Sequence, residues 1–304
     1  MNRVLMSLQA LLTSIVDYAG LFPPAQLSLP DAIAVYDRAK VSPYAWMLNH
    51  FVIPASRLVE LDQALATLAP DQQSTTSWAL SVILSKDWMA ELATLQAMND
   101  LSGGNPETGM TIAAWEIAPL PPEQIFQVCQ HLPSSVPAFF EIPGDAELAP
   151  YLSVLQQTNR AAKLRTGGVT AVAFPDSHQL SHRILALAAA GIPFKATAGL
   201  HHPLRGKHLL TEQPHSPVAM MHGFLNVVVL AALVYQQSLS LDEATALLET
   251  LTIAPLQFTD TAIRWHDRTL SIPEINQSRQ QFFHSFGSCS FQDPITDLHT
   301  LGLL

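Results

Sequence analysis

The feature that most constrains the fold is a repeated alternation of short apolar runs with longer helical stretches. The apolar runs are predicted strands, and most of them end at Pro or Gly; they lie at 44–53, 78–84, 110–117, 137–142, 160–166 and 192–197. The first five runs each precede a predicted helix; the helices lie within 56–69, 85–101, 122–131, 145–158 and 176–190. A repeat of about 25–35 residues is typical of a parallel sheet whose strands are joined by crossover helices.

The number and character of these units favour a closed barrel. Strands that are apolar on both faces are typical of a sheet covered on both sides. Beyond position 199 the chain continues for about 100 residues, enough for two more units. No Gly-x-Gly-x-x-Gly turn follows the first predicted strand, which weakens the doubly wound alternative. We therefore expect an α/β fold of the (β/α)8 TIM type, irregular in its last two units and with extra helices near both termini.

The chain is expected to form one domain, because no linker or low-complexity tract interrupts its 304 residues. Its parts are an N-terminal helical extension (1–42), six β–α units (43–199) and an irregular, helix-rich completion (200–304). Candidate strands seven and eight lie in 253–258 and 262–272, although the latter reads equally as a hairpin.

The stretch 217–237 is predicted to be a long helix that is apolar all round. Such a helix suits a buried core position and a subunit interface equally well, so homo-oligomerisation stays open.

Composition excludes several classes of protein. Charged residues make up 13 % of the chain and the net charge is −10, with no run of Lys or Arg, which argues against a nucleic-acid partner. No apolar stretch reaches the roughly 20 residues of a membrane-spanning helix. The two cysteines, Cys129 and Cys289, are far apart, so we expect a reducing compartment and a cytoplasmic protein.

Ionic side chains lie near the carboxyl ends of consecutive predicted strands, where the active sites of TIM barrels are built. They are Glu116, Glu141, Lys163, Arg165 and Lys195. Unpaired buried charges cost several kcal/mol each, so these groups are expected to pair around one pocket entrance. Charges that merely neutralise one another inside the barrel are the alternative.

The surroundings of this cluster predict a small anionic ligand. Two acids face three bases, and the loop after the sixth predicted strand adds His201, His202 and Arg205. Arg165 is the candidate anchor, because its planar guanidinium matches a carboxylate or phosphate. Thr197 shares a strand face with Lys195.

Two flanking segments are further candidates for contact with the ligand. Gly167 and Gly168 permit close approach of backbone N–H groups to an anion, although an ordinary tight turn explains them equally well. Asp17 and Tyr18 precede the barrel in a turn-rich segment; a structural role is favoured there, and an acid–base pair that caps the site is the alternative.

Lys195 on the sixth predicted strand is the candidate nucleophile or general base. Burial and a neighbouring cation, Lys163, are expected to depress its pKa and leave an amine that adds to a carbonyl as a Schiff base. Glu141 or Glu116 then moves protons.

The two strands that carry these lysines, 162–168 and 193–199, resemble those of aldolase-type (β/α)8 barrels, several of which carry a Schiff-base lysine on strand six. The resemblance implies the barrel fold and a candidate chemistry, that of a lyase or aldolase, and it indicates no substrate. Together with the local charges, it leads us to expect an enzyme that acts on a small anionic carbonyl compound without a cofactor.

Two other functions remain open. Glu116, Glu141 and one of His201 or His202 suit a divalent cation, which predicts a metal-dependent lyase or isomerase. A non-catalytic barrel that binds a ligand or partner is the third hypothesis. Cys289, in a Gly/Ser-rich turn, is a minor candidate for a thiol nucleophile.

Overall fold

A computed structural model describes residues 3–67, 77–97, 109–211 and 215–304. Its centre is a closed barrel of eight parallel strands, which confirms the predicted TIM-type fold. Around the ring the strands are β1 Val16–Tyr18, β2 Leu48–Pro54, β3 Trp78–Leu84, β4 Met110–Ile117, β5 Ala138–Ile142, β6 Ala161–Arg165, β7 Phe194–Thr197 and β13 Phe283–Ser288.

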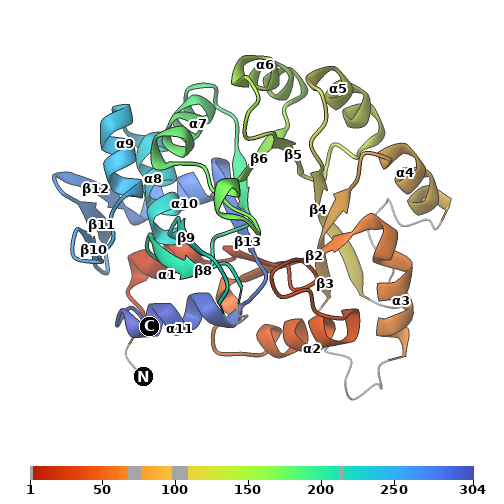
Figure 1. Cartoon of the computed structure of the whole chain (residues 1–304), viewed down its shortest axis with the longest axis horizontal. Coiled ribbons are helices and arrows are strands. Elements are labelled where there is room, and N and C mark those ends of the chain that lie inside the picture. Colours follow the sequence, from red (N-terminus) through yellow and green to blue (C-terminus); the bar gives the residue numbers. More distant parts are fainter. Residues whose placement is uncertain (1–2, 68–76, 98–108, 212–214) are drawn as a thin grey trace.

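Helices surround the strands on the outside of the barrel (Figure 1). Those that connect successive strands are α2 Leu29–Lys40, α3 Leu58–Ala66, α4 Trp88–Ala97, α5 Pro122–His131, α6 Leu148–Thr158 and α7 Ser177–Ala189. Local signals set several of their ends. Asp176 and Gln179 form a reciprocal capping box at the start of α7, and the Ser28 hydroxyl accepts from the Asp31 N–H at the start of α2.

The six predicted strands coincide with β2 to β7, but the two strands that close the barrel lie elsewhere than predicted. β1 lies in the segment expected to be only a helical extension, between α1 (Met6–Leu12) and α2. β13 begins at residue 283, beyond both expected positions, 253–258 and 262–272. As a result, Lys163 is on the sixth strand of the barrel and Lys195 is on the seventh.

Residues 253–258 and 262–272 do not supply barrel strands. They form a three-stranded antiparallel sheet, β10 Leu256–Phe258, β11 Ala262–Trp265 and β12 Arg268–Ser271, which lies outside the ring of strands (Figure 1). The hairpin alternative for 262–272 is therefore correct, because β11 and β12 pair directly around a tight turn.

The remaining elements follow β7. A hairpin of β8 (Gly206–Leu209) and β9 (Val218–Met221) replaces the start of the predicted helix 217–237. The later helices are α8 Phe224–Gln236, α9 Leu241–Leu248, α10 Ile272–Gln281 and α11 Gln292–Thr300. Every residue of α8 from Phe224 to Leu233 is buried within this chain, which accounts for its apolar character on all sides. Among the described helices, none has both the length and the apolar character needed to span a bilayer.

Candidate active site

Six ionic side chains of alternating sign form one connected series inside the barrel, which we call the ionic ladder. Its members, in order of contact, are Asp17, Lys195, Glu116, Lys163, Glu141 and Arg165. Lys195 Nζ contacts Asp17 Oδ2 and lies 2.5 Å from Glu116 Oε1. Lys163 Nζ lies 3.2 Å from Glu116 Oε2 and 3.0 Å from Glu141 Oε2, and Arg165 Nε lies 3.1 Å from Glu141 Oε1.

Strand register brings the middle of the ladder together. Glu141 is paired with Lys163 across β5 and β6, and Lys163 is paired with Lys195 across β6 and β7. Side chains alternate between the two faces of a strand, so these three neighbours all project to the inner face. Exposure increases along the ladder, from 0 % for the Asp17 side chain to 49 % for that of Arg165.

Asp17 is a buried member of the cluster and not a cap over it. Its carboxylate also accepts hydrogen bonds from Asn49 Nδ2 (2.8 Å), the His50 N–H (3.2 Å) and Ser285 Oγ (2.5 Å). Burial by itself raises the pKa of this carboxyl, but the Lys195 ammonium and the His50 contact outweigh burial and hold the pKa far below its usual range. Asp17 is therefore ionised in the folded protein.

The same balance acts on the other ladder carboxylates. Burial opposes ionisation of Glu116, but Lys195 and Lys163 lower its pKa to about 2. Burial also opposes ionisation of Glu141, whose pKa is lowered by Lys163 and Arg165. The ladder thus contains three acids and three bases, and the locally positive mouth expected from two acids and three bases is corrected to a neutral one.

The electrostatic role expected for Lys195 is wrong. Burial favours its neutral form, but the carboxylates of Asp17 and Glu116 outweigh burial and raise the pKa of Lys195 above its usual value. The neighbour that adjusts its charge state is a pair of anions and not the Lys163 cation, because Glu116 lies between the two ammonium groups. Lys195 is accordingly a buried cation, 1 % exposed.

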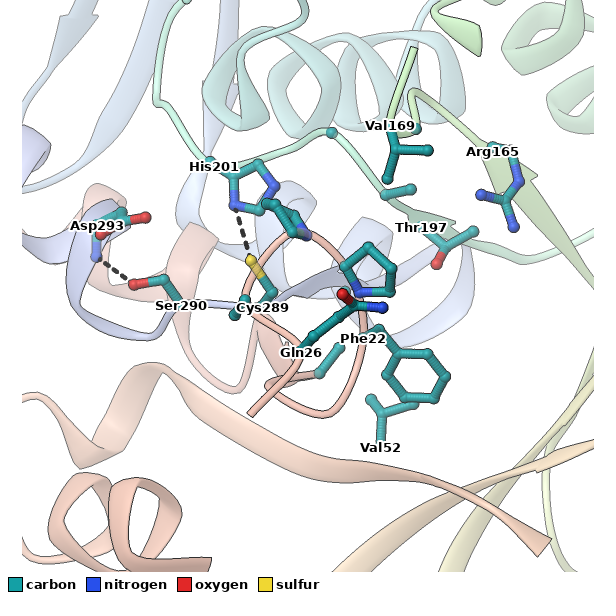
Figure 2. A pocket seen from close by; sticks show the side chains of 18 of the residues that line it. Phe22, Gln26, Val52, Arg165, Val169, Thr197, His201, Cys289, Ser290 and Asp293 are labelled. Atoms are coloured by element: carbon teal, nitrogen blue, oxygen red, sulfur yellow. Dashed lines mark hydrogen bonds between the residues drawn. The ribbon is translucent and has the colours of Figure 1, made fainter. Parts of the chain in front are cut away.

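A cavity of about 1490 Å³ opens at the carboxyl ends of the strands (Figure 2). Four ladder residues line it: Glu116, Glu141, Lys163 and Arg165. Asp17 and Lys195 do not line it, and lie deeper in the barrel. The volume exceeds the roughly 300–1,000 Å³ of a typical ligand pocket, so the cavity has room for more than a small anion.

Other predicted residues also line the cavity, among them Thr197, His201 and His202. His202 Nδ1 lies 2.6 Å from Asp297 Oδ2. The His202 ring stacks on the His208 ring, with 3.4 Å between the two ring centroids. These contacts fix the His202 ring as part of the cavity wall.

The remaining predicted residues have structural contacts. Arg205 does not line the cavity, and its N–H donates to Asn226 Oδ1 (3.0 Å). Gly168 lines the cavity, whereas Gly167 packs against the loop after β7: a Cβ there would lie 2.4 Å from Phe174 and 2.9 Å from the Gly199 Cα. Close packing of two loops therefore accounts for Gly167 without a ligand.

The predicted metal ligands do not form a metal site. Glu116 and Glu141 are paired with ammonium groups, and His201 contacts Ser288 and Cys289 instead of either glutamate. Within the described parts of the chain, no three His, Cys, Asp or Glu side chains are grouped so that they would hold a metal ion. A cation would have to displace the lysines, so the donor set does not fit a metal.

Several polar residues of the site were not predicted from the sequence. Ser81 Oγ donates to Glu116 Oε1 (2.8 Å), and Asn49, His50 and Ser285 surround Asp17. Ser81 carried a usable signal, because it is the single polar residue in the otherwise apolar strand Trp78–Leu84. Asn49 and Ser285 lie in less regular sequences, where no such contrast exists.

Comparison with known proteins adds no relative: no protein-family model, curated protein or solved structure matches the chain significantly.

Proposed function

We propose that the protein is an enzyme that acts on a small anionic carbonyl compound at the carboxyl-terminal mouth of the barrel, with Lys163 as the amine that meets the substrate. The observation that carries this proposal is the position of Lys163, which lines the cavity and whose Nζ lies 3.2 Å from Glu116 Oε2 and 3.0 Å from Glu141 Oε2. Lys195 has no such access, so its role becomes that of a positioning residue that holds Asp17 and Glu116.

The pairing of Lys163 with two carboxylates supplies a path for its protons. Glu141 Oε2, 3.0 Å away, is the base that takes a proton from the ammonium group and leaves a neutral amine. This transfer runs against the lowered pKa of Glu141, so the neutral amine is a minor species that forms only for the reaction. The amine nitrogen attacks the carbonyl carbon, and the π electron pair moves to the oxygen, which takes up a proton from Glu141. The carbinolamine then loses water, with a second proton transfer, to give an iminium ion.

Arg165 is the group best placed to bind the anionic part of the substrate. Its Nε donates to Glu141, and its half-exposed side chain leaves other guanidinium N–H groups for a ligand at the mouth. A carboxylate or phosphate accepts two parallel hydrogen bonds from such a group. The carbonyl of a short oxo-acid bound in this way would lie toward Lys163, which Glu141 bridges to Arg165.

The resemblance to aldolase-type barrels supports the same choice of lysine. Several of those enzymes carry their Schiff-base lysine on strand six, and with β1 counted, Lys163 occupies strand six of this barrel. The resemblance bears on chemistry through this position only, because a shared fold does not determine function.

Borohydride trapping tests the proposal. The protein is incubated with pyruvate, glyoxylate and longer 2-oxo acids, reduced with sodium borohydride, and digested for mass spectrometry. We expect a reduced adduct on Lys163 that is lost in Lys163→Arg and retained in Lys86→Arg, a matched change at an exposed lysine. A label on Lys195 would return the nucleophilic role to that residue. Absence of a label on every lysine would reject the Schiff base, and saturable binding without a label would support the ligand-binding barrel instead.

A further inference from the structure

We propose that Cys289, His201 and Tyr18 form a second reactive site in the same cavity, at which the Cys289 thiol adds reversibly to an aldehyde. The three residues come from neighbouring strands. Tyr18 ends β1 and is paired with Ser288 at the end of β13, Cys289 comes next in the chain, and His201 lies in the loop after β7. All three line the cavity, and in Figure 2 the Cys289–His201 pair lies across it from Arg165.

The hydrogen bonds around His201 orient its ring toward the sulfur. The Ser288 hydroxyl has one proton and donates it to the Ser290 carbonyl (2.7 Å), so Ser288 Oγ can only accept from His201 Nδ1, 3.3 Å away. His201 is therefore the Nδ1–H tautomer. The same Nδ1 lies 3.9 Å from Cys289 Sγ, so its N–H also faces the sulfur and stabilises negative charge there.

A neutral imidazole suits this role. Burial lowers the pKa of His201 to about 4, so at neutral pH the ring is uncharged and donates through one nitrogen only.

Tyr18 supplies a hydrogen-bond donor without a hydrogen-bond partner in the part of the chain that the structure describes. Its side chain is 1 % exposed, and its hydroxyl is buried without a hydrogen bond among the described residues. A Cβ on Gly20 would lie 2.1 Å from the Tyr18 hydroxyl, so the glycine at that position is what lets the phenol lie there. Burial, and then the nearby Cys289, raise the pKa of Tyr18 and keep the phenol protonated. An unsatisfied buried hydroxyl costs free energy, which a ligand oxygen would recover.

Cys289 and Tyr18 act together in one addition reaction. The thiol gives its proton to solvent, and the thiolate sulfur attacks the carbonyl carbon of the aldehyde. A carbon–sulfur bond forms while the π electron pair moves to the oxygen, which accepts a hydrogen bond from Tyr18 and then a proton from solvent. The product is a hemithioacetal, so the net change is addition of the thiol to the aldehyde and no oxidant or reductant is consumed.

Nuclear magnetic resonance with propionaldehyde labelled with ¹³C at its carbonyl tests the site. We expect a hemithioacetal carbon signal in the wild type and in Cys129→Ala, and none in Cys289→Ala. Cys129 is a suitable control because it is half-buried on α5 and does not line the cavity. Tyr18→Phe should weaken the adduct about tenfold through loss of the hydrogen bond to oxygen. It should not lower stability, because the Tyr18 hydroxyl has no hydrogen-bond partner within the described parts of the chain.

Alkylation by iodoacetamide provides a second measurement. Cys289 should react faster than Cys129 although it is the more buried thiol. His201→Ala should slow the reaction about tenfold and His201→Asn should restore it, because the Asn amide also donates an N–H. The rate should be unchanged in Lys163→Arg, which separates this proposal from the Schiff-base proposal. A hemithioacetal signal that is absent from the wild type or survives in Cys289→Ala, or a Cys289 that reacts no faster than Cys129, would overturn the inference.

Discussion

Replacing Lys195 with methionine tests the central contact of the ionic ladder. The ammonium group is shared by Asp17 and Glu116, which are 0 % and 2 % exposed, so its removal leaves two buried carboxylates with less compensation. Removing one partner of a buried ion pair costs about 3–5 kcal/mol. We expect the lower end of this range, because Asp17 keeps its hydrogen bonds from neighbouring side chains and Glu116 keeps Lys163 and Ser81.

The assay is urea unfolding followed by tryptophan fluorescence, with Arg165→Met as the matched control. Arg165 is 49 % exposed, and an ion pair at the surface contributes at most about 1 kcal/mol. The difference in unfolding free energy between the wild type and Lys195→Met should also become smaller as the pH falls from neutrality. Without the ammonium group the pKa of Glu116 rises, so the buried carboxyl takes up a proton and loses its unfavourable charge. A loss of under about 1 kcal/mol, equal to that of Arg165→Met, would refute the assignment of Lys195 as the shared partner.

Three further predictions concern stability. Burial, followed by nearby Arg279 and Lys195, lowers the pKa of His284 to about 4. The unfolded chain then binds a proton that the folded one does not, so this residue by itself removes about 3 kcal/mol of stability between about pH 6.5 and pH 4, and His201 adds a fall in the same direction. Urea midpoints across this range check it, and the profile of His284→Gln should be less steep than that of the wild type. Gly167→Ala should cost about 1–3 kcal/mol by overpacking, whereas Gly144→Ala, where a Cβ meets nothing within 4 Å, should be neutral by the same assay. Asn226→Leu should lower stability by about 3 kcal/mol, measured by thermal unfolding, because one buried and two part-buried backbone groups lose their partner.

Most of the fold could be predicted because β2 to β7 are apolar on both faces and regularly spaced. The two closing strands were missed for a physical reason. β1 has three residues, too few for any periodicity, and its central residue is the buried Asp17. The sequence of β13, Phe-His-Ser-Phe-Gly-Ser, lacks the apolar run of the other strands. Its Ser285 projects inward and donates to the Asp17 carboxylate, where an apolar side chain would otherwise be expected. The ring closes on polar contacts at this seam, so hydrophobicity marks neither strand.

The convergence of the charged residues could be predicted as well, because the carboxyl ends of parallel barrel strands meet at one mouth. That they pair was expected, but which acid pairs with which base could not be predicted. Which lysine reaches the cavity depends on how deep each residue lies in the barrel, and the sequence does not show this depth. In addition, because β1 was not predicted, Lys195 was placed on the sixth strand instead of the seventh. The charge state of Lys195 was mispredicted for the same reason. Asp17, which raises its pKa most strongly, was expected to lie outside the barrel.

The contact between Asp17 and Lys195 joins positions 178 residues apart, and that between Asp17 and Ser285 joins positions 268 residues apart. During synthesis the carboxylate therefore leaves the ribosome long before its counter-ion, and stays hydrated until most of the chain has been made. Dehydrating it earlier would bury a charge without compensation. The ring itself closes only when β1 pairs with β13 at residues 283–288, so we expect barrel closure to be a late event in biogenesis.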